Sequence, residues 1–358
     1  MDLAVLDTNF KRKKPVENWS SLVWTERFSS NGDFELVSNN ISEIMSILPL
    51  GGPLDPPCLV SIAGSDVPMV VESHKLEKPK NEAPRVITTG RSFETVLDRR
   101  VTVKDVTSGV KRVEWAIEAQ TAAIAAYEAA KRLIEAGSAT ITEDIIPEIK
   151  LLQGVADVGT LQKFPVEPKE LYAWMIDTLA LGRYGLKSVL NNIYPGQIIV
   201  QTYKGTDRRT SVVFDVALDQ FEEAAYFLSK LGYKNIMITS TANGMEFSTT
   251  GTNPSGLARR VDFQDISSEV TIAAGADLTN LTINKGKVAL ADRLPTALFS
   301  GGVAASIGEG YNSTYFLGDI VKLQGEYGLS QDARVAEFVR THDQTGSKSY
   351  PTFEAYTS

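Results

Sequence analysis

The sequence contains few of the side chains on which most catalytic and metal sites depend. Among 358 residues there is one cysteine, Cys58, and there are two histidines, His74 and His342. Zinc sites, Ser-His-Asp triads and Cys-His pairs need several such side chains in one place. We therefore expect no metal ion and no active site of these types, and we expect both histidines to be non-catalytic.

The single cysteine also limits disulfide chemistry. Cys58 has no second cysteine with which to form an internal disulfide, and it lies among proline and apolar residues in the run Pro56–Val60. A cysteine in such surroundings usually behaves as a small buried hydrophobic residue. The sequence is therefore consistent with a protein that is synthesised and folds in a reducing cytoplasm.

Long apolar runs are missing as well. No stretch approaches the roughly 20 apolar residues that a membrane-spanning helix needs. The chain starts Met1-Asp2-Leu3 and lacks the basic region and apolar core of an export signal. We expect neither a membrane anchor nor Sec-dependent export.

Positive charge is in deficit. Lysine and arginine total 36 against 44 aspartate and glutamate residues, which gives a formal net charge of -8. Proteins that hold nucleic acid through its phosphates need a basic surface, so sequence-specific nucleic-acid binding is not expected. The basic run Lys11–Lys14 stands alone near one terminus, and we interpret it as a solvated segment.

Nucleotide-binding and hydrolase motifs are absent from the sequence. It has no G-x-S-x-G elbow, no G-x-x-x-x-G-K-[ST] loop and no G-x-G-x-x-G after a strand, so we expect no cofactor. Carboxylates are plentiful, and glycoside cleavage needs only two of them about 5–10 Å apart. Nothing singles out such a pair, because Glu143-Asp144 and Glu222-Glu223 have the pattern of solvated helix residues.

The first part of the chain has the alternating apolar pattern of β-strands. Apolar residues alternate over 22–28 and over 34–36, on either side of the turn Asn31-Gly32, which predicts a hairpin. Further strands are expected at 59–63, 69–76 and 86–89, followed by a short helix at 92–97.

The middle of the chain changes to a helical pattern. Residues 113–136 are rich in alanine and carry larger apolar residues at helical spacing, and Gly137 is a natural stop. A second helix is expected from Pro168 to Gly182. We therefore expect a helical insert or linker over residues 106–190.

A second β-region follows. Strands are expected at 198–203 and 211–214, then an amphipathic helix over 218–228, a hairpin at Asn243-Gly244, and strands at 315–323 and 334–341. Residues 271–310 are rich in alanine and glycine, and we interpret them as an insertion. The expected organisation is an α+β chain with a first β-domain at 1–105, the helical insert at 106–190 and a second β-domain at 191–358.

Several arginines lie beside turns or at the ends of predicted elements. They are Arg91, Arg99, Arg100, Arg208 and Arg209, and Arg259-Arg260 precedes a strand-like segment in the same way. A guanidinium group donates two parallel hydrogen bonds to a carboxylate and so fixes its geometry. We predict that the first five contribute to contacts between subunits. Pairing within one chain, or plain exposure, is the alternative.

Short segments spread between residues 19 and 341 carry a further signal. They are Trp24–Phe28, Gly32–Leu36, Thr89–Phe93, Leu97–Arg100, Gln201–Arg209, Val212–Phe214, Leu317–Val321, Tyr327-Gly328 and Ala333–Glu337. Together and in this order they resemble the baseplate-hub minor tail proteins of long-tailed bacteriophages, notably those of actinobacterial hosts.

The resemblance implies a homotrimer at the tip of the tail tube. Each subunit would supply two tail-tube-like β-barrel domains, each with a short helix, so that three subunits mimic a sixfold ring. The implied partners are a hexameric distal tail or tail tube protein, the tape measure protein, and a tip fibre or other minor tail proteins. The implied location is the tail tip of the virion.

We therefore expect a structural hub without enzymatic activity, which connects the tail tube to the tip and lets DNA pass. Two alternatives remain open at the level of the sequence. One is a cell-wall glycoside hydrolase that uses two carboxylates. The other is a receptor-binding module that holds host saccharide on exposed aromatic side chains such as Tyr311 and Tyr315.

Overall fold

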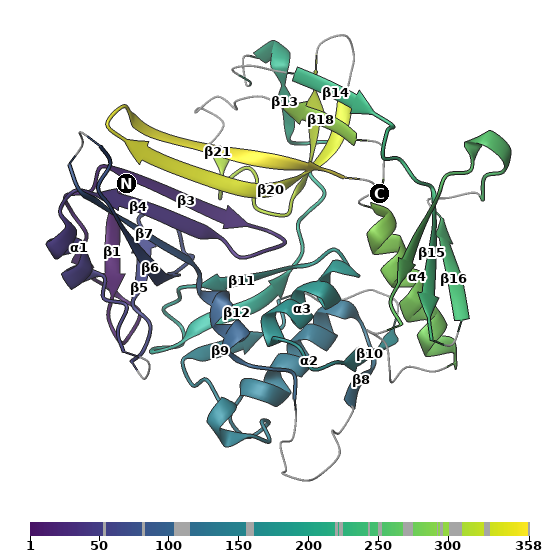
Figure 1. The fold of residues 1–358 in the computed structure, drawn as a ribbon, viewed down its shortest axis with the longest axis horizontal. Helices are drawn as coiled ribbons and strands as arrows, with labels where there is room; N and C mark the ends of the chain where they lie inside the picture. Colours follow the sequence, from purple (N-terminus) through teal and green to yellow (C-terminus); the bar gives the residue numbers. More distant parts are fainter. Residues whose placement is uncertain are drawn as a thin grey trace.

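The fold is mostly β with some helices, 43% strand and 21% helix. The computed structural model describes residues 1–52, 55–80, 83–103, 115–154, 161–218, 221, 225–242, 244–249, 253–267, 275–291, 293, 296–300, 310–325 and 330–356. Figure 1 shows a large sheet formed by the two ends of the chain, a mixed α/β segment below it, and a small sheet with one helix to the side.

The large sheet joins both ends of the chain. Its strands are β1 (Leu3–Leu6), β2 (Arg12–Pro15), β3 (Ser21–Arg27), β4 (Asp33–Ser38), β5 (Leu59–Ile62), β6 (Met69–Glu77), β7 (Arg85–Ser92), β13 (Val213–Asp215), β19 (Ile320–Gln324), β20 (Ser330–Asp343) and β21 (Gly346–Ala355). The order is β13-β19-β20-β3-β4-β7-β6-β5-β1-β2, with β21 also paired to β20. Within the described residues this path has two open ends and does not close into a barrel.

Strand β20 is the link between the two ends. One of its edges pairs with β19 over residues 330–334 and then with β3 over 337–342, while β21 follows its other edge. A single 14-residue strand therefore spans the C-terminal β-region and the N-terminal one.

The N-terminal strands follow the predicted alternation. Trp24 on β3 lies directly opposite Phe34 on β4, with ring centroids 5.8 Å apart, and both side chains are buried. Helix α1 (Ile41–Ile47) covers this core through Ile44. Cys58 packs against the same core half-buried, and burial raises the pKa of its thiol to about 11.

Most predicted elements of this region are confirmed. The hairpin β3–β4, the strands β5, β6 and β7, and a short 3₁₀ helix η1 (Phe93–Arg99) are all present. Strands β1 and β2 were not predicted. The basic run Lys11–Lys14 overlaps β2 and is exposed, as expected for a solvated segment.

The middle segment is mixed rather than purely helical. It contains β8 (Trp115–Gln120), α2 (Ala122–Ile134), η2 (Thr142–Asp144), β9 (Ile149–Leu152), β10 (Gln162–Val166), α3 (Leu171–Ala180), β11 (Gly185–Val189) and β12 (Ile198–Tyr203). The alanine-rich face of α2 is buried and packs against α3.

The expectation of one helix over 113–136 is wrong for its first part. Residues Trp115–Gln120 form strand β8, which pairs antiparallel with β10, and Ile117 lies opposite Phe164 with both side chains buried. Pairing with a segment about 45 residues away outweighs the local preference for helix. The second predicted helix is confirmed as α3.

The last third contains a second correction. The amphipathic helix expected over 218–228 is wrong, because Ala225–Ser229 form strand β14, which pairs with β18 (Thr296–Ser300). Residues 219–220 and 222–224, which include Glu222-Glu223, lie outside the described residues. A short 3₁₀ turn η3 (Val216–Leu218) is all that is helical here in the described part.

A small sheet forms the side of the molecule. The predicted hairpin is confirmed as β15 (Ile236–Thr241) and β16 (Gly244–Thr249), although Asn243 lies outside the described residues. Strand β17 (Val261–Asp265) pairs parallel with β15 after the turn η4 (Gly256–Ala258), and helix α4 (Gly275–Ala291) packs on the sheet. The region 271–310 thus holds α4 and β18 within its described parts. None of the described helices has the length and apolar character to cross a membrane.

Candidate functional site

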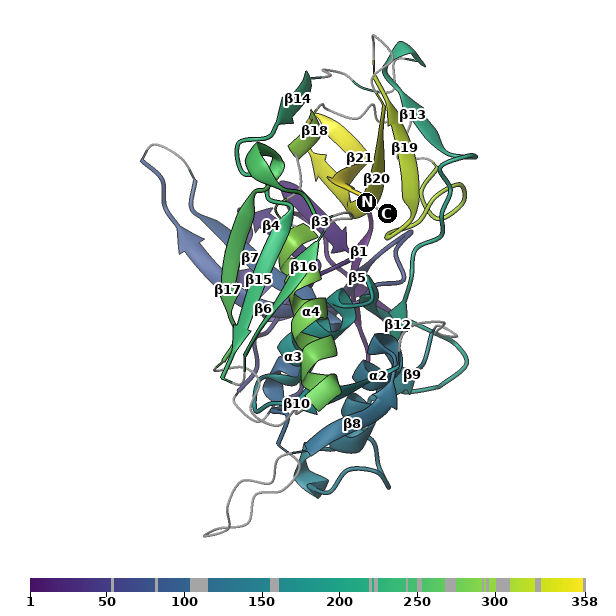
Figure 2. The same ribbon diagram turned by 90° about the vertical axis from the view of Figure 1, so that its right-hand side faces the viewer.

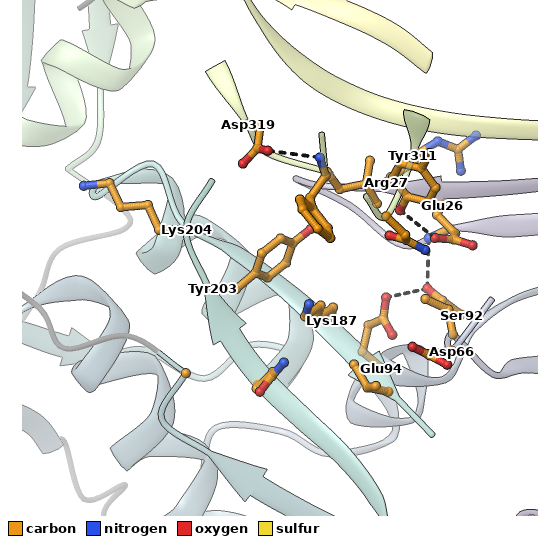
Figure 3. A pocket seen from close by; sticks show the side chains of 18 of the residues that line it. Glu26, Arg27, Asp66, Ser92, Glu94, Lys187, Tyr203, Lys204, Tyr311 and Asp319 are labelled. Carbon is orange, nitrogen blue, oxygen red and sulfur yellow. Dashed lines mark hydrogen bonds between the residues drawn. The ribbon is translucent and has the colours of Figure 1, made fainter. Parts of the chain in front are cut away.

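A cavity lies where the three parts of the chain meet. It has a volume of about 360 Å³ and is lined by side chains from β3, η1, β11, β12 and the 310–319 segment. Figure 3 shows Glu26, Glu94, Lys187, Tyr203 and Tyr311 around this space. The walls carry both polar and apolar side chains, and several of the polar ones are joined by hydrogen bonds and ion pairs.

Glu26 is at the centre of the first polar cluster. Its position in β3 follows the inward alternation of Leu22 and Trp24, and only 4% of its surface is exposed. Arg340 on β20, equally buried, forms an ion pair with its Oε1 atom. Ser65 Oγ donates to the same oxygen over 2.7 Å, and the Tyr311 hydroxyl donates to Oε2 over 2.9 Å. The buried carboxylate therefore has donors at both oxygens.

Arg340 is held equally firmly. Its second terminal nitrogen donates to the Gly64 carbonyl over 3.1 Å, and its guanidinium lies over the rings of Phe338 and Tyr311 at 4.7 and 5.4 Å. The Tyr311 ring stacks on Phe338 with centroids 3.7 Å apart. Burial and the Glu26 charge raise the pKa of Tyr311.

The expectation that Tyr311 and Tyr315 are exposed is wrong. Tyr315 is 1% exposed and packs edge-on against Phe214, and Tyr311 is enclosed by its contacts with Phe338 and Glu26. The local sequence Gly310–Thr314 is polar, but the segment folds its two tyrosines inward. The Tyr315 ring is therefore not available to stack on a saccharide, and the partly buried Tyr311 ring already stacks on Phe338.

Glu94 forms a second buried cluster, at the start of η1. Ser92 Oγ donates to one carboxyl oxygen and Ser188 Oγ, from β11, donates to the other, each over 2.5 Å. Ser92 Oγ in turn accepts the Gly32 N–H over 2.9 Å. Burial raises the pKa of Glu94, partly offset by the two serine hydroxyls. This carboxyl connects the β3–β4 turn, η1 and the middle segment.

Asp319 is the third buried carboxylate of the site. Arg208 Nε lies 2.6 Å from its Oδ2, and the backbone N–H groups of Thr206 and Phe316 donate over 2.7 and 3.0 Å. The chain approaches so closely here that a Cβ at Gly205 would lie 1.7 Å from the Gly318 carbonyl oxygen. Only glycine permits this contact between the two segments.

Lys187 and Tyr203 complete the cavity wall. The Lys187 ammonium lies 4.7 Å from the centre of the Tyr203 ring, and burial lowers its pKa. Among the described residues the Tyr203 hydroxyl is buried without a hydrogen-bond partner. A cavity of this size and polarity can hold water that would satisfy such a group.

The arrangement offers limited chemistry. Glu26 and Glu94 line the same cavity, but both oxygens of each carboxyl already accept hydrogen bonds from the chain itself. No group of three or more potential metal ligands occurs within the described part of the chain. His74 is hydrogen-bonded to Thr88 Oγ1 and to the Leu48 carbonyl, which is a structural role.

The five predicted interface arginines lie in two places. Arg91, Arg99 and Arg100 surround η1, whereas Arg208 and Arg209 follow β12. Arg91 pairs with Glu72 and Asp98, Arg100 with Asp144, Arg208 with Asp319, and Arg209 with Asp207 and Asp332. The hydrogen bonds from Arg209 lower the pKa of Asp207 to about 2. Arg99 is exposed and forms no ion pair within the described residues. A role of these arginines between subunits stays a prediction.

Comparison with known proteins decides the family. The family model described as "Siphovirus ReqiPepy6 Gp37-like protein" matches residues 2–353. The chain belongs to this family. The predicted resemblance to the tail proteins of long-tailed phages is thereby confirmed at the level of the family.

Solved structures of phage tail proteins share the fold of this chain. The 43 kDa tail protein of prophage MuSo2 from Shewanella oneidensis matches with a TM-score of 0.54 and 13% identity, over 99% of this chain and 98% of that one. A tail protein from Neisseria meningitidis MC58 matches with a TM-score of 0.57 and 13% identity, over 98% and 95%. Prophage tail protein gp18 from Listeria monocytogenes EGD-e matches with 0.55 and 11%, over 100% and 96%. None of the curated proteins that were compared matches the chain.

The buried clusters of the Gp37-like chain were missed at the level of the sequence. A signal for Glu26 existed, because it occupies an inward position of the alternation that includes Trp24, and a charge at such a position needs a partner. No comparable local signal marks Arg340, whose partner is 314 residues away, or Glu94.

We predict that Arg340→Met destabilises the fold strongly. Removing one partner of a buried ion pair leaves an uncompensated charge and costs about 3–5 kcal/mol. Arg293→Met, which breaks the exposed pair with Asp262, should cost only about 0–1 kcal/mol. Urea denaturation of both variants tests this, and equal losses would contradict a special role for the Glu26–Arg340 pair.

We also predict that Glu94→Gln changes the pH dependence of stability. Because burial raises the pKa of Glu94 above its ordinary value of 4.5, the folded state is penalised once the carboxyl ionises as pH rises. The free energy of unfolding of the variant, relative to that of the native chain, should therefore increase as pH rises from 4.5 towards 8.

For a second variant, Asp343→Asn, stability relative to the native chain should change with pH in the opposite direction. Hydrogen bonds from Thr345 lower the pKa of Asp343, so its ionised form stabilises the fold at neutral pH. The free energy of unfolding of Asp343→Asn, relative to that of the native chain, should therefore decrease as pH rises from 3 to 6. Urea denaturation from pH 3 to pH 8 measures both effects. A difference between Glu94→Gln and the native chain that stays constant with pH would refute the predicted role of Glu94.

Proposed function

We propose that this protein is the baseplate hub of a siphovirus tail. Three copies form a ring at the tip of the tail tube, connect the tube or distal tail protein to the tip fibre, and leave a passage for DNA. The observation that carries the proposal is the family match over residues 2–353, together with the fold shared with phage tail proteins over nearly the whole chain.

The large open sheet supports a role in assembly. Its end strands β2 and β13 each pair on one side only within the described residues. Unpaired strand edges tend to bind further strands, and a head-to-tail contact that repeats around an axis closes into a ring. In the proposed ring, the β1–β7 region and the β13, β19–β21 region act as two related tail-tube-like domains, with the division at 1–105, 106–190 and 191–358 as expected from the sequence.

Contacts with other tail proteins complete the proposal. The hexameric distal tail or tail tube protein lies on one side of the ring and the tip fibre on the other, and the tape measure protein reaches it through the tube. Among the predicted interface arginines, Arg99 has the most freedom to pair across subunits, because its side chain is exposed and makes no ion pair within the described chain.

A second candidate is a cell-wall glycoside hydrolase. One observation favours it: two buried carboxyls, Glu26 and Glu94, line one cavity, and burial raises the pKa of Glu94 as a general acid would require. A zymogram on host cell walls separates the two candidates. Clearing by the purified chain that is lost in Glu94→Gln would favour the hydrolase.

The hub is tested by the solution mass of the purified chain, measured by light scattering over a concentration series. We expect a mass that is a multiple of three times the 39.0 kDa of one chain. A monomer at every concentration, or a species that is not a multiple of three, would count against the ring.

A further inference from the structure

In the small sheet β16-β15-β17, the more polar face is turned toward the protein and the more apolar face toward solvent. Side chains alternate along the strands, so one face carries Met237, Thr239, Thr241, Glu246, Ser248, Asp262 and Gln264, and the other carries Ile236, Ile238, Ser240, Met245, Phe247, Val261, Phe263 and Asp265. A sheet normally buries its apolar face against its own chain and exposes the polar one. Here the chain does the opposite.

Helix α4 covers the polar face. Ser248 Oγ donates to the Ile283 carbonyl over 2.7 Å, Thr279 Oγ1 donates to Glu246 over 3.2 Å, and a Cβ at Gly286 would lie 2.6 Å from Thr239 Oγ1. Figure 1 shows α4 between this sheet and the middle segment, where it also contacts β10. Thr239 and Ser248 are therefore buried beneath α4, whereas Glu246, Asp262 and Gln264 on the same face are partly buried.

The apolar face points away from the body of the protein except at the start of β15, where Ile236 is buried. Met245 is 68% exposed, and Phe247 and Phe263 are each 57% exposed. Figure 2 shows the three strands side by side at the front of the molecule in this view. Large apolar side chains gathered on one exposed sheet face mark a surface that another molecule covers.

The charges along β17 indicate which molecule that is. Every second residue from Arg259 to Asp265 lies on the exposed face, which gives the row Arg259, Val261, Phe263, Asp265: positive, apolar, apolar, negative. Arg259 has an extended backbone and is exposed, and neither Arg259 nor Asp265 forms an ion pair within the described residues. Each makes only local hydrogen bonds: Arg259 donates to Asn253 Oδ1 and the Pro254 carbonyl, and Asp265 accepts the Ser267 N–H. A row of this kind is complementary to itself when one copy is turned by 180°.

We propose that this face, defined by Met245, Phe247, Val261, Phe263, Arg259 and Asp265, binds the same face of a second copy of the chain. A two-fold axis sets Arg259 of one copy against Asp265 of the other, and stacks the apolar side chains between these two ion pairs. The contact is independent of the proposed ring, because it uses a two-fold rather than a threefold axis. This two-fold contact would join two single chains or, if the chains form rings, two rings.

The test is the solution mass of the full chain with and without changes on this face. Phe263→Lys and Phe247→Lys should each halve the mass, from dimer to monomer or from two rings to one. Ile193→Lys changes a residue that is 76% exposed, in the turn between β11 and β12, and should leave the mass unchanged. Thermal unfolding checks that each variant is folded.

Charge reversal provides a second measurement that needs no change in the apolar residues. Arg259→Asp alone should halve the mass, and Arg259→Asp combined with Asp265→Arg should restore it, because the row is then reversed but still self-complementary. A native mass that none of these variants changes, or a double variant that stays at half mass, would overturn the proposal. Failure of the ring shows separately, as a native mass that is not a multiple of three.

Discussion

The arrangement of the whole chain depends on the pairing of β20 with β3. This pairing brings residues more than 300 positions apart into one sheet, and the ion pair between Glu26 and Arg340 lies beneath it. Burying two charges is costly unless their remaining hydrogen-bonding groups are satisfied. Ser65, Tyr311 and the Gly64 carbonyl satisfy them. Removing the two charges from water costs free energy. The hydrogen bonds that offset this cost form only when β3, β20 and the 310–319 segment are correctly placed.

The same principle extends to the middle segment. Glu94 accepts hydrogen bonds from Ser92 beside it and from Ser188 on β11, and Asp319 ties the turn after β12 to the start of β19. An apolar cluster also joins η1 to α2 and α3 of the middle segment, and the polar contacts add fixed geometry around the cavity. Fully satisfied polar networks of this kind favour a single geometry.

The sequence predicts those parts of the fold in which local pattern and tertiary packing agree. The alternation around Asn31-Gly32 locates the β3–β4 hairpin, and the apolar run 198–203 is strand β12 with the same bounds. It fails where a distant strand decides the outcome: Trp115–Gln120 and Ala225–Ser229 have helical spacing, yet each pairs with a strand tens of residues away. The buried clusters were beyond reach for the same reason, since no local pattern connects Glu26 with Arg340.

Cryo-electron microscopy of the intact virion tail tests whether this siphovirus family member forms the proposed ring at the tail tip. We expect threefold density at the distal end of the tail tube into which three copies of this fold fit, with the β2 and β13 edges facing neighbouring subunits. Density for this fold in sixfold rings along the tube, or its absence from the tail tip, would rule out the proposed hub.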